Sequence, residues 1–110
     1  MAVGWAGDGT LLSQAPAATA SRRNPLQGQE RARRSGAKLF AQECASCHGE
    51  NGAGGVGKAP RLRQPEVLGA SPGALFWVLR NGSRQNGMPS FAHLPEPQRW
   101  QIITWLTAQP

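Results

Sequence analysis

The chain is poor in the residues from which most catalytic and metal sites are built. Its 110 residues include no tyrosine, only two cysteines, two histidines and six acidic residues. No run approaches the roughly 18 consecutive apolar residues of a membrane-spanning helix, and no alternating pattern indicates strands. The apolar fraction of 39% is marginal for the core of a small domain. We therefore expect one small helical domain that needs a further source of buried apolar surface.

Both cysteines and one histidine fall in a single segment. Residues 44–48 read Cys-Ala-Ser-Cys-His, the C-x-x-C-H pattern to which a haem is bonded covalently. Two thiols three positions apart, near the end of a helix, can add to the two vinyl groups of one porphyrin. The residue after the second thiol then presents an imidazole to the iron. The segment predicts one haem c per chain, tethered by Cys44 and Cys47, with His48 as the first axial ligand.

Three other interpretations compete for the same residues. A thioredoxin-like redox motif opens a helix after a strand, whereas the residues before Cys44 favour a helix. A zinc site needs four ligands around a tetrahedron, and adjacent Cys47 and His48 would bind one small ion awkwardly, even with His93. A disulfide would leave His48 unexplained. Haem attachment accounts for all three residues together.

A haem iron held by one histidine needs a second ligand or an open position. Met88 stands between Gly87 and Pro89, where glycine allows an unusual backbone angle and proline restrains the backbone beside it. We expect the Met88 thioether to be the distal ligand. His93 and an open or water-bound iron are the alternatives. Ligation by histidine and methionine fills both axial positions and raises the reduction potential, which suits a carrier of single electrons.

The remaining pattern predicts helices separated by loops. Residues 30–44 contain good helix formers and no proline, and Gly36 with Phe40 lies on one face, where the glycine favours close approach of another helix. Ser71 followed by Pro72 is a typical helix start. We expect helices or helical turns at 30–44, 65–68, 72–81 and 97–107. Residues 1–26, which show no hydrophobic period, are expected to be a flexible leader or linker before a domain at 27–110.

The net charge of +6 is spread along the chain, and no predicted helix concentrates it, so we do not expect nucleic acid as a partner.

Residues 52–58 fit G-x-x-x-x-G-K, the front of a phosphate-binding loop. Ala59 stands where Ser or Thr is needed, Pro60 disfavours a helix there, and no strand precedes the loop. We do not expect nucleotide binding. Arginines 61, 63, 80 and 84 are interpreted as solvated surface charge, or as partners of haem propionates.

Over residues 24–108 the sequence resembles the small bacterial mono-haem class I c-type cytochromes. The resemblance implies that the carbonyl of Pro60 accepts a hydrogen bond from the proximal imidazole, and that Leu62 packs on the porphyrin. It also implies that an aromatic residue of the last helix packs against the glycine of the first. The matching residues are Gly36, Phe40, Cys44, Cys47, His48, Pro60, Leu62, Met88, Ile102, Trp105 and Leu106.

The resemblance implies an all-α fold of three main helices and loops wrapped around one haem. It implies an electron carrier rather than an enzyme, acting between periplasmic redox partners such as a dehydrogenase or a terminal oxidase. A haem enzyme or gas sensor with a displaceable distal ligand is the alternative. We expect the partner to be acidic at its docking face, because this chain is basic. The periplasmic location implies a signal or anchor not visible here, so membrane association is expected only through a partner or a missing anchor.

Overall fold

The regular structure of the chain is helical. A computed structural model describes residues 10–49, 52, 62 and 64–108. Within these ranges there is no β-strand, and one isolated bridge pairs Ser83 with Met88. The all-α prediction is confirmed. The helices are α1 (Thr10–Ser13), α2 (Ala17–Ala20), α3 (Glu30–Glu43), α4 (Ala45–His48), α5 (Pro65–Leu68), α6 (Pro72–Asn81), the 3-10 turn η1 (Arg84–Asn86) and α7 (Glu96–Ala108).

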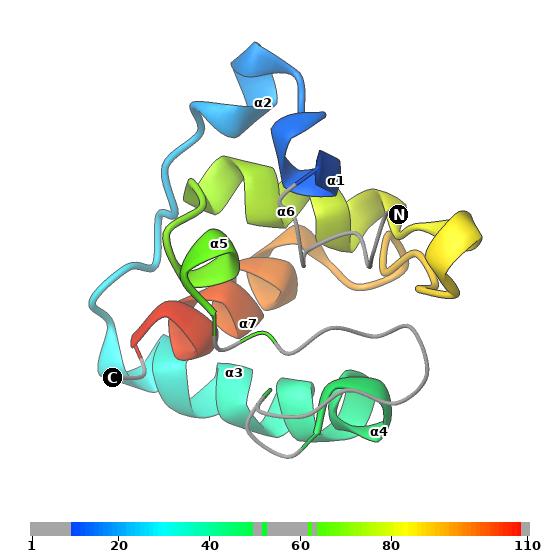
Figure 1. Cartoon of the computed structure of the whole chain (residues 1–110). Helices are drawn as coiled ribbons and strands as arrows, with labels where there is room; N and C mark the ends of the chain where they lie inside the picture. Colours follow the sequence, from blue (N-terminus) through cyan, green and yellow to red (C-terminus); the bar gives the residue numbers. More distant parts are fainter. Residues whose placement is uncertain (1–9, 50–51, 53–61, 63, 109–110) are drawn as a thin grey trace.

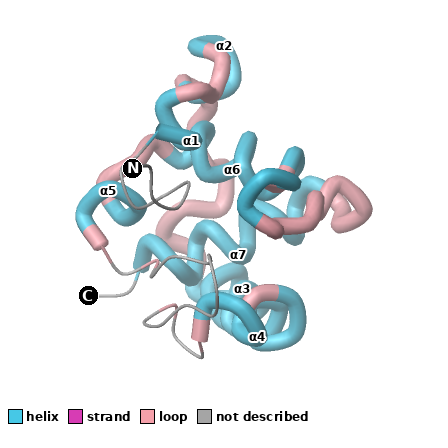
Figure 2. The backbone as a smooth tube through the Cα atoms, turned by 45° about the vertical axis from the view of Figure 1, so that its right-hand side comes forward, coloured by secondary structure: helices cyan, strands magenta, loops and turns pink. Residues whose placement is uncertain are grey.

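Three longer helices form the body of the molecule. Figure 1 shows α3 along the bottom of the view, α7 above it, and α6 above α7, with α1 and α2 over α6. The tube in Figure 2 shows the same helices joined by loops. None of the helices in the described part of the chain combines the length and apolarity of a membrane span. The buried core residues come chiefly from α6 and α7, and Phe40 of α3 packs among them.

The helices α3 and α7 cross closely at Gly36. A Cβ atom at this position would overlap the carbonyl oxygen of Gln101 and come within 3.0 Å of the Trp105 Cβ. One turn later, the rings of Phe40 and Trp105 pack with their centroids 4.6 Å apart. The prediction that Gly36 admits a second helix, with an aromatic residue against it, is confirmed.

The start and end of α6 follow from its sequence. The Ser71 hydroxyl accepts a hydrogen bond from the Ala74 amide, Pro72 occupies the first turn, and the helix ends at Gly82 with φ of +66°. Apolar residues surround the helix, and residues on several of its faces are buried, as the sequence predicted. The Phe76 ring stacks on Trp100 of α7 at a centroid distance of 4.1 Å. This stack joins α6 to α7.

Residues 10–26, part of the segment expected to be a flexible leader, pack against the helices that follow. The Leu12 side chain is 6% exposed and belongs to the core, and α1 and α2 both contact α6. Glycine at position 73 leaves room for α2, since a Cβ there would overlap the Thr19 carbonyl. The Ser71 hydroxyl also donates a hydrogen bond to the Ala20 carbonyl at 2.7 Å. Two apolar residues in one helical turn give no visible period, which is why this packing was not predicted.

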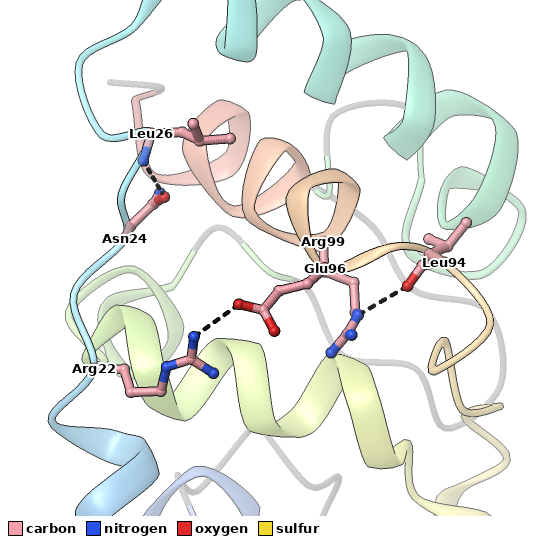
Figure 3. A network of polar contacts seen from close by, with 6 residues as sticks. All are labelled: Arg22, Asn24, Leu26, Leu94, Glu96 and Arg99. Carbon is pink, nitrogen blue, oxygen red and sulfur yellow. Dashed lines mark hydrogen bonds and ion pairs between the residues drawn. The ribbon is translucent and has the colours of Figure 1, made fainter.

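Polar contacts attach the end of this segment to α7. The buried Asn24 side chain donates a hydrogen bond to the Thr104 hydroxyl at 2.8 Å and accepts one from the Leu26 amide at 2.9 Å. In Figure 3, Arg22 reaches toward Glu96 at the start of α7, and their charged groups are 2.8 Å apart. Residues 10–26 are therefore joined to the helical body. A domain boundary at residue 26 remains a prediction.

Replacing Gly36 with alanine is expected to lower the free energy of unfolding by about 1 to 3 kcal/mol, the usual range for overpacking. The added methyl group meets backbone, which has little freedom to move. Ser35→Ala, in the same helix, is the control and should change stability by less than about 0.5 kcal/mol. Chemical denaturation of the two variants measures the difference. Equal stabilities would contradict the proposed closeness of this crossing.

Asn24→Ala is expected to destabilise the protein by about 1 to 2 kcal/mol, because the Thr104 hydroxyl loses a buried hydrogen-bond partner. The exposed Gln27 provides the control, and Gln27→Ala should be almost neutral. Chemical denaturation again gives the comparison. If both variants unfold like the parent protein, residues 10–26 do not contribute to the folded body.

Candidate functional site

The C-x-x-C-H segment forms a tight turn at the end of α3. The Cys44 amide donates the last hydrogen bond of this helix, to the Phe40 carbonyl at 2.8 Å. The next turn, α4, is closed by the His48 amide, which donates to the Cys44 carbonyl at 3.0 Å. Gly49, with φ of +84°, ends it. The side chains of Cys44 and His48 are buried, whereas Cys47 is exposed. The helix predicted for residues 30–44 ends one residue earlier, because the chain turns at Cys44.

Both cysteines are free thiols. Burial, followed by the Glu43 carboxylate and Cys47, raises the pKa of the Cys44 thiol to about 12. The thiol therefore stays protonated near neutral pH.

An apolar cavity opens beside this turn. It has a volume of about 40 Å³, and its lining is almost wholly apolar. His48 from α4, Leu62 and Met88 reach it from separate parts of the chain, and α6 and α7 supply further wall residues. Its lining residues are Phe40, Cys44, His48, Leu62, Val67, Leu75, Val78, Leu79, Met88, Ile102, Ile103 and Leu106. A thiol, an imidazole and a thioether at one apolar cavity are the donor set that a covalently attached haem requires, so the residues present fit this group.

Met88 is positioned by a short backbone loop. Ser83 and Met88 exchange two backbone hydrogen bonds of 2.9 Å each, with η1 between them. Gly87 adopts a left-handed conformation with φ of +79°, as the glycine before the methionine led us to expect. The loop then returns to α6, where the Phe91 amide donates to the Leu79 carbonyl at 2.9 Å. This loop fixes Met88 as part of the cavity wall.

Gly82 makes this return possible. It has φ of +66°, and a Cβ atom there would lie 2.6 Å from the Pro89 carbonyl and 2.7 Å from the Met88 oxygen. The Ser90 hydroxyl donates to the Arg80 carbonyl at 2.5 Å. Gly82 therefore lets the loop cross directly over the end of α6.

The other candidate residues lie in different surroundings. His93 is exposed, packs near the Phe91 ring at a centroid distance of 5.9 Å, and does not line the cavity. Leu62 is buried in the cavity wall, and its amide donates to the Gly52 carbonyl at 2.7 Å. Pro60 lies outside the described residues, as does most of the loop at 52–58. The roles of Cys44, Cys47, His48, Pro60, Leu62 and Met88 remain predictions.

Sequence reasoning did not assign several wall residues to the site. Leu75, Val78 and Leu79 recur at intervals of three and four, so they share one face of α6, and Ile103 stands beside Ile102 on α7. The apolar run at the start of α6 predicted that these residues are buried, but it did not show which face of the helix lines the cavity. Val67 of α5, fully buried, completes this wall.

Gly82→Ala is expected to lower the free energy of unfolding by about 2 kcal/mol or more, because the alanine meets both an unfavourable φ and the backbone of the Met88 loop. Gly28 has a similar φ of +83° with open space around it, so Gly28→Ala isolates the conformational cost of about 1 kcal/mol. Chemical denaturation compares the two. A smaller loss at position 82 than at 28 would contradict the contact between Gly82 and the loop.

Comparisons with known proteins agree with this fold. Residues 31–106 match the family described as cytochrome c oxidase, cbb3-type, subunit III. Cytochrome cL from Methylophaga aminisulfidivorans has 23% identity and a TM-score of 0.67, over 78% of this chain and 58% of that one. Cytochrome cL from Hyphomicrobium denitrificans has 19% identity and a TM-score of 0.62, over 88% and 64%.

A further solved structure is the reducing HAO-like protein complex Kustc0457/Kustc0458 from Kuenenia stuttgartiensis. One of its chains has 25% identity and a TM-score of 0.65, over 76% of this chain and 46% of that one. This chain thus spans about half to two thirds of the length of these structures, and no curated protein sequence matches it. Because the family match covers most of the chain, the chain belongs to the cbb3-type cytochrome c oxidase subunit III family, and its resemblance to c-type cytochromes is confirmed.

Proposed function

We propose that this chain carries single electrons on one haem c, which Cys44 and Cys47 would tether and whose iron His48 and Met88 would ligate. Membership of a cytochrome c family supports electron transport by a haem protein. The same membership favours a carrier over an enzyme. The proposal goes beyond family membership where it names the residues that hold the haem and the ligands of its iron.

The observation that carries the proposal is the common cavity of His48 and Met88. The two residues are 40 positions apart in the sequence. His48 lies in a helical turn, and Met88 lies in a hairpin-like loop. Both line the same apolar cavity, as does Cys44. His93, the other candidate ligand, lies outside it. This arrangement favours ligation by histidine and methionine.

The protein side chains have separable tasks in this proposal. The two thiols would tether the group, and burial of His48 shields its imidazole from water. The loop between Ser83 and Met88 restricts where the thioether can lie. Apolar walls from α6 and α7 lower the local dielectric, which would disfavour the more highly charged oxidised iron and raise its reduction potential. When bound, the haem would supply an iron centre that accepts and releases one electron.

Two further residues are proposed to support the ligands. Leu62, in the cavity wall, would pack on the porphyrin. Pro60 would accept a hydrogen bond from the His48 imidazole, which fixes the ring orientation and raises the basicity of the ligand. Both residues lie in the segment that follows α4 in the chain.

The proposed partners are redox proteins of the periplasm, such as a dehydrogenase or a terminal oxidase. The net charge of +6 favours an acidic docking face on the partner, because opposite charges speed encounter. We propose residues 27–110 as the cytochrome domain. Membrane association would come from a partner or from an anchor elsewhere in the full protein.

The Met88→Ala variant of the haem-loaded protein is expected to lose the sulfur-to-iron band of the oxidised form, because the only thioether lining the cavity in the described part of the chain is removed. His93→Ala is the matched control and should keep the band. Visible absorption spectra of the oxidised proteins measure both. A band that survives in Met88→Ala, or disappears in His93→Ala, would show that the ligand is assigned incorrectly.

The same samples distinguish the carrier from a haem enzyme or gas sensor. If Met88 holds its position, the reduced parent protein should bind carbon monoxide slowly at neutral pH, and Met88→Ala should bind it at least about tenfold faster, the change produced by a barrier difference of about 1.4 kcal/mol. Rapid binding by the parent protein would support the displaceable ligand instead.

A further inference from the structure

A second cavity lies at another face of α6 and has different chemistry. It has a volume of about 320 Å³ and lies between α6, the beginning of α7, and α2 with the segment that follows it. Phe76, Trp77 and Arg80 line it, whereas Leu75, Val78 and Leu79 of the same helix line the first cavity. At about 100° per residue, the two sets lie on nearly opposite faces of the helix. The second cavity is therefore separate from the proposed haem site.

Arg99 is the unusual residue of this cavity. Its side chain is buried, with the whole residue only 7% exposed, and its Nε donates to the Leu94 carbonyl at 3.2 Å, as Figure 3 shows. The buried Nη1 has no hydrogen-bond partner among the described residues. An unsatisfied buried donor on a charged group is costly. A ligand with an acceptor oxygen would remove that cost.

The charges around Arg99 favour an anion. Arg22 and Arg80 also line the cavity, and Glu96 is the one acidic residue in its lining. Burial first, and then Arg80 and Arg22, lower the pKa of Arg99, while Glu96 opposes the shift. A guanidinium nevertheless stays protonated at physiological pH, so three positive groups face one negative group. Glu96 is already engaged with Arg22 at 2.8 Å.

An aromatic ring holds two of these guanidinium groups in place. The Cζ atoms of Arg22 and Arg99 lie 4.8 and 4.6 Å from the centre of the Phe76 ring. Such cation–π contacts restrict the orientation of the planar guanidinium groups. The donors are therefore arranged before a ligand arrives, which lowers the entropic cost of binding.

We propose that this cavity is a binding site for a small oxyanion, a carboxylate or a phosphate, with Nη1 of Arg99 as the inner donor and Arg80 and Arg22 as the outer ones. The size of the cavity suits a small molecule, and the key donor is buried rather than displayed on the surface. Glu96 competes with the ligand, because its carboxylate already occupies Arg22.

Isothermal titration of the haem-loaded protein with inorganic phosphate, and separately with succinate, tests the proposal against chloride at equal ionic strength. We expect saturable binding of at least one of the two, and the one that binds identifies the ligand class. Arg80→Gln should weaken binding at least about fivefold, because a charge-assisted hydrogen bond is lost. Glu96→Gln should tighten it at least about threefold, since a competing negative charge is removed.

The exposed Arg34 on α3, outside the cavity lining, provides the control, and Arg34→Gln should leave the affinity unchanged. Arg99→Lys retains the charge but loses the planar fork, so binding should weaken about tenfold. If that variant does not fold, the exposed Arg80 and Glu96 still decide the matter. Absence of saturable binding beyond chloride would overturn the proposal, as would affinities equal in the parent, Arg80→Gln and Glu96→Gln proteins.

Discussion

The crossing of α3 and α7 at Gly36 is the contact on which the site depends. Because a glycine lies at the crossing, the α3 backbone approaches the Gln101 carbonyl without steric overlap. One turn further along α3, Phe40 packs on Trp105, and one turn beyond that is Cys44. The close approach therefore brings the C-x-x-C-H turn against the wall that Ile102, Ile103 and Leu106 form. A looser crossing would separate the thiols and the imidazole from that wall.

The part of the cavity wall that includes Met88 is built differently. Met88 is not on a helix, and backbone geometry holds it instead: the paired hydrogen bonds with Ser83 and the positive φ of Gly82 and Gly87. Because the loop starts at the end of α6 and returns to it at Leu79, the position of Met88 follows that of α6. In turn, α6 is joined to α7 through the stack of Phe76 on Trp100. The positions of both proposed iron ligands, His48 and Met88, therefore depend on packing against α7.

The features that could be predicted from the sequence are those that depend on neighbouring residues in the chain. The helix start at Ser71 and Pro72, the helix around Gly36 and Phe40, and the turn at 65–68 each depend on residues within a few positions, and the structure confirms them. The cavity wall was only partly predicted, because an apolar helix such as α6 does not show which face meets which cavity. The docking of residues 10–24 depends on single long-range contacts, such as Asn24 with Thr104, which leave no periodic signal. Arg99 was unpredictable for the same reason, since its burial arises from the packing of α6 on α7.

X-ray absorption at the iron edge of the purified, haem-loaded protein tests the central claim most directly. The account predicts nitrogen scatterers from the porphyrin and His48, together with a sulfur scatterer from Met88 in the first coordination shell. An iron coordinated by nitrogen and oxygen alone would contradict it, as would a purified chain that contains no iron after expression with a haem-attachment system.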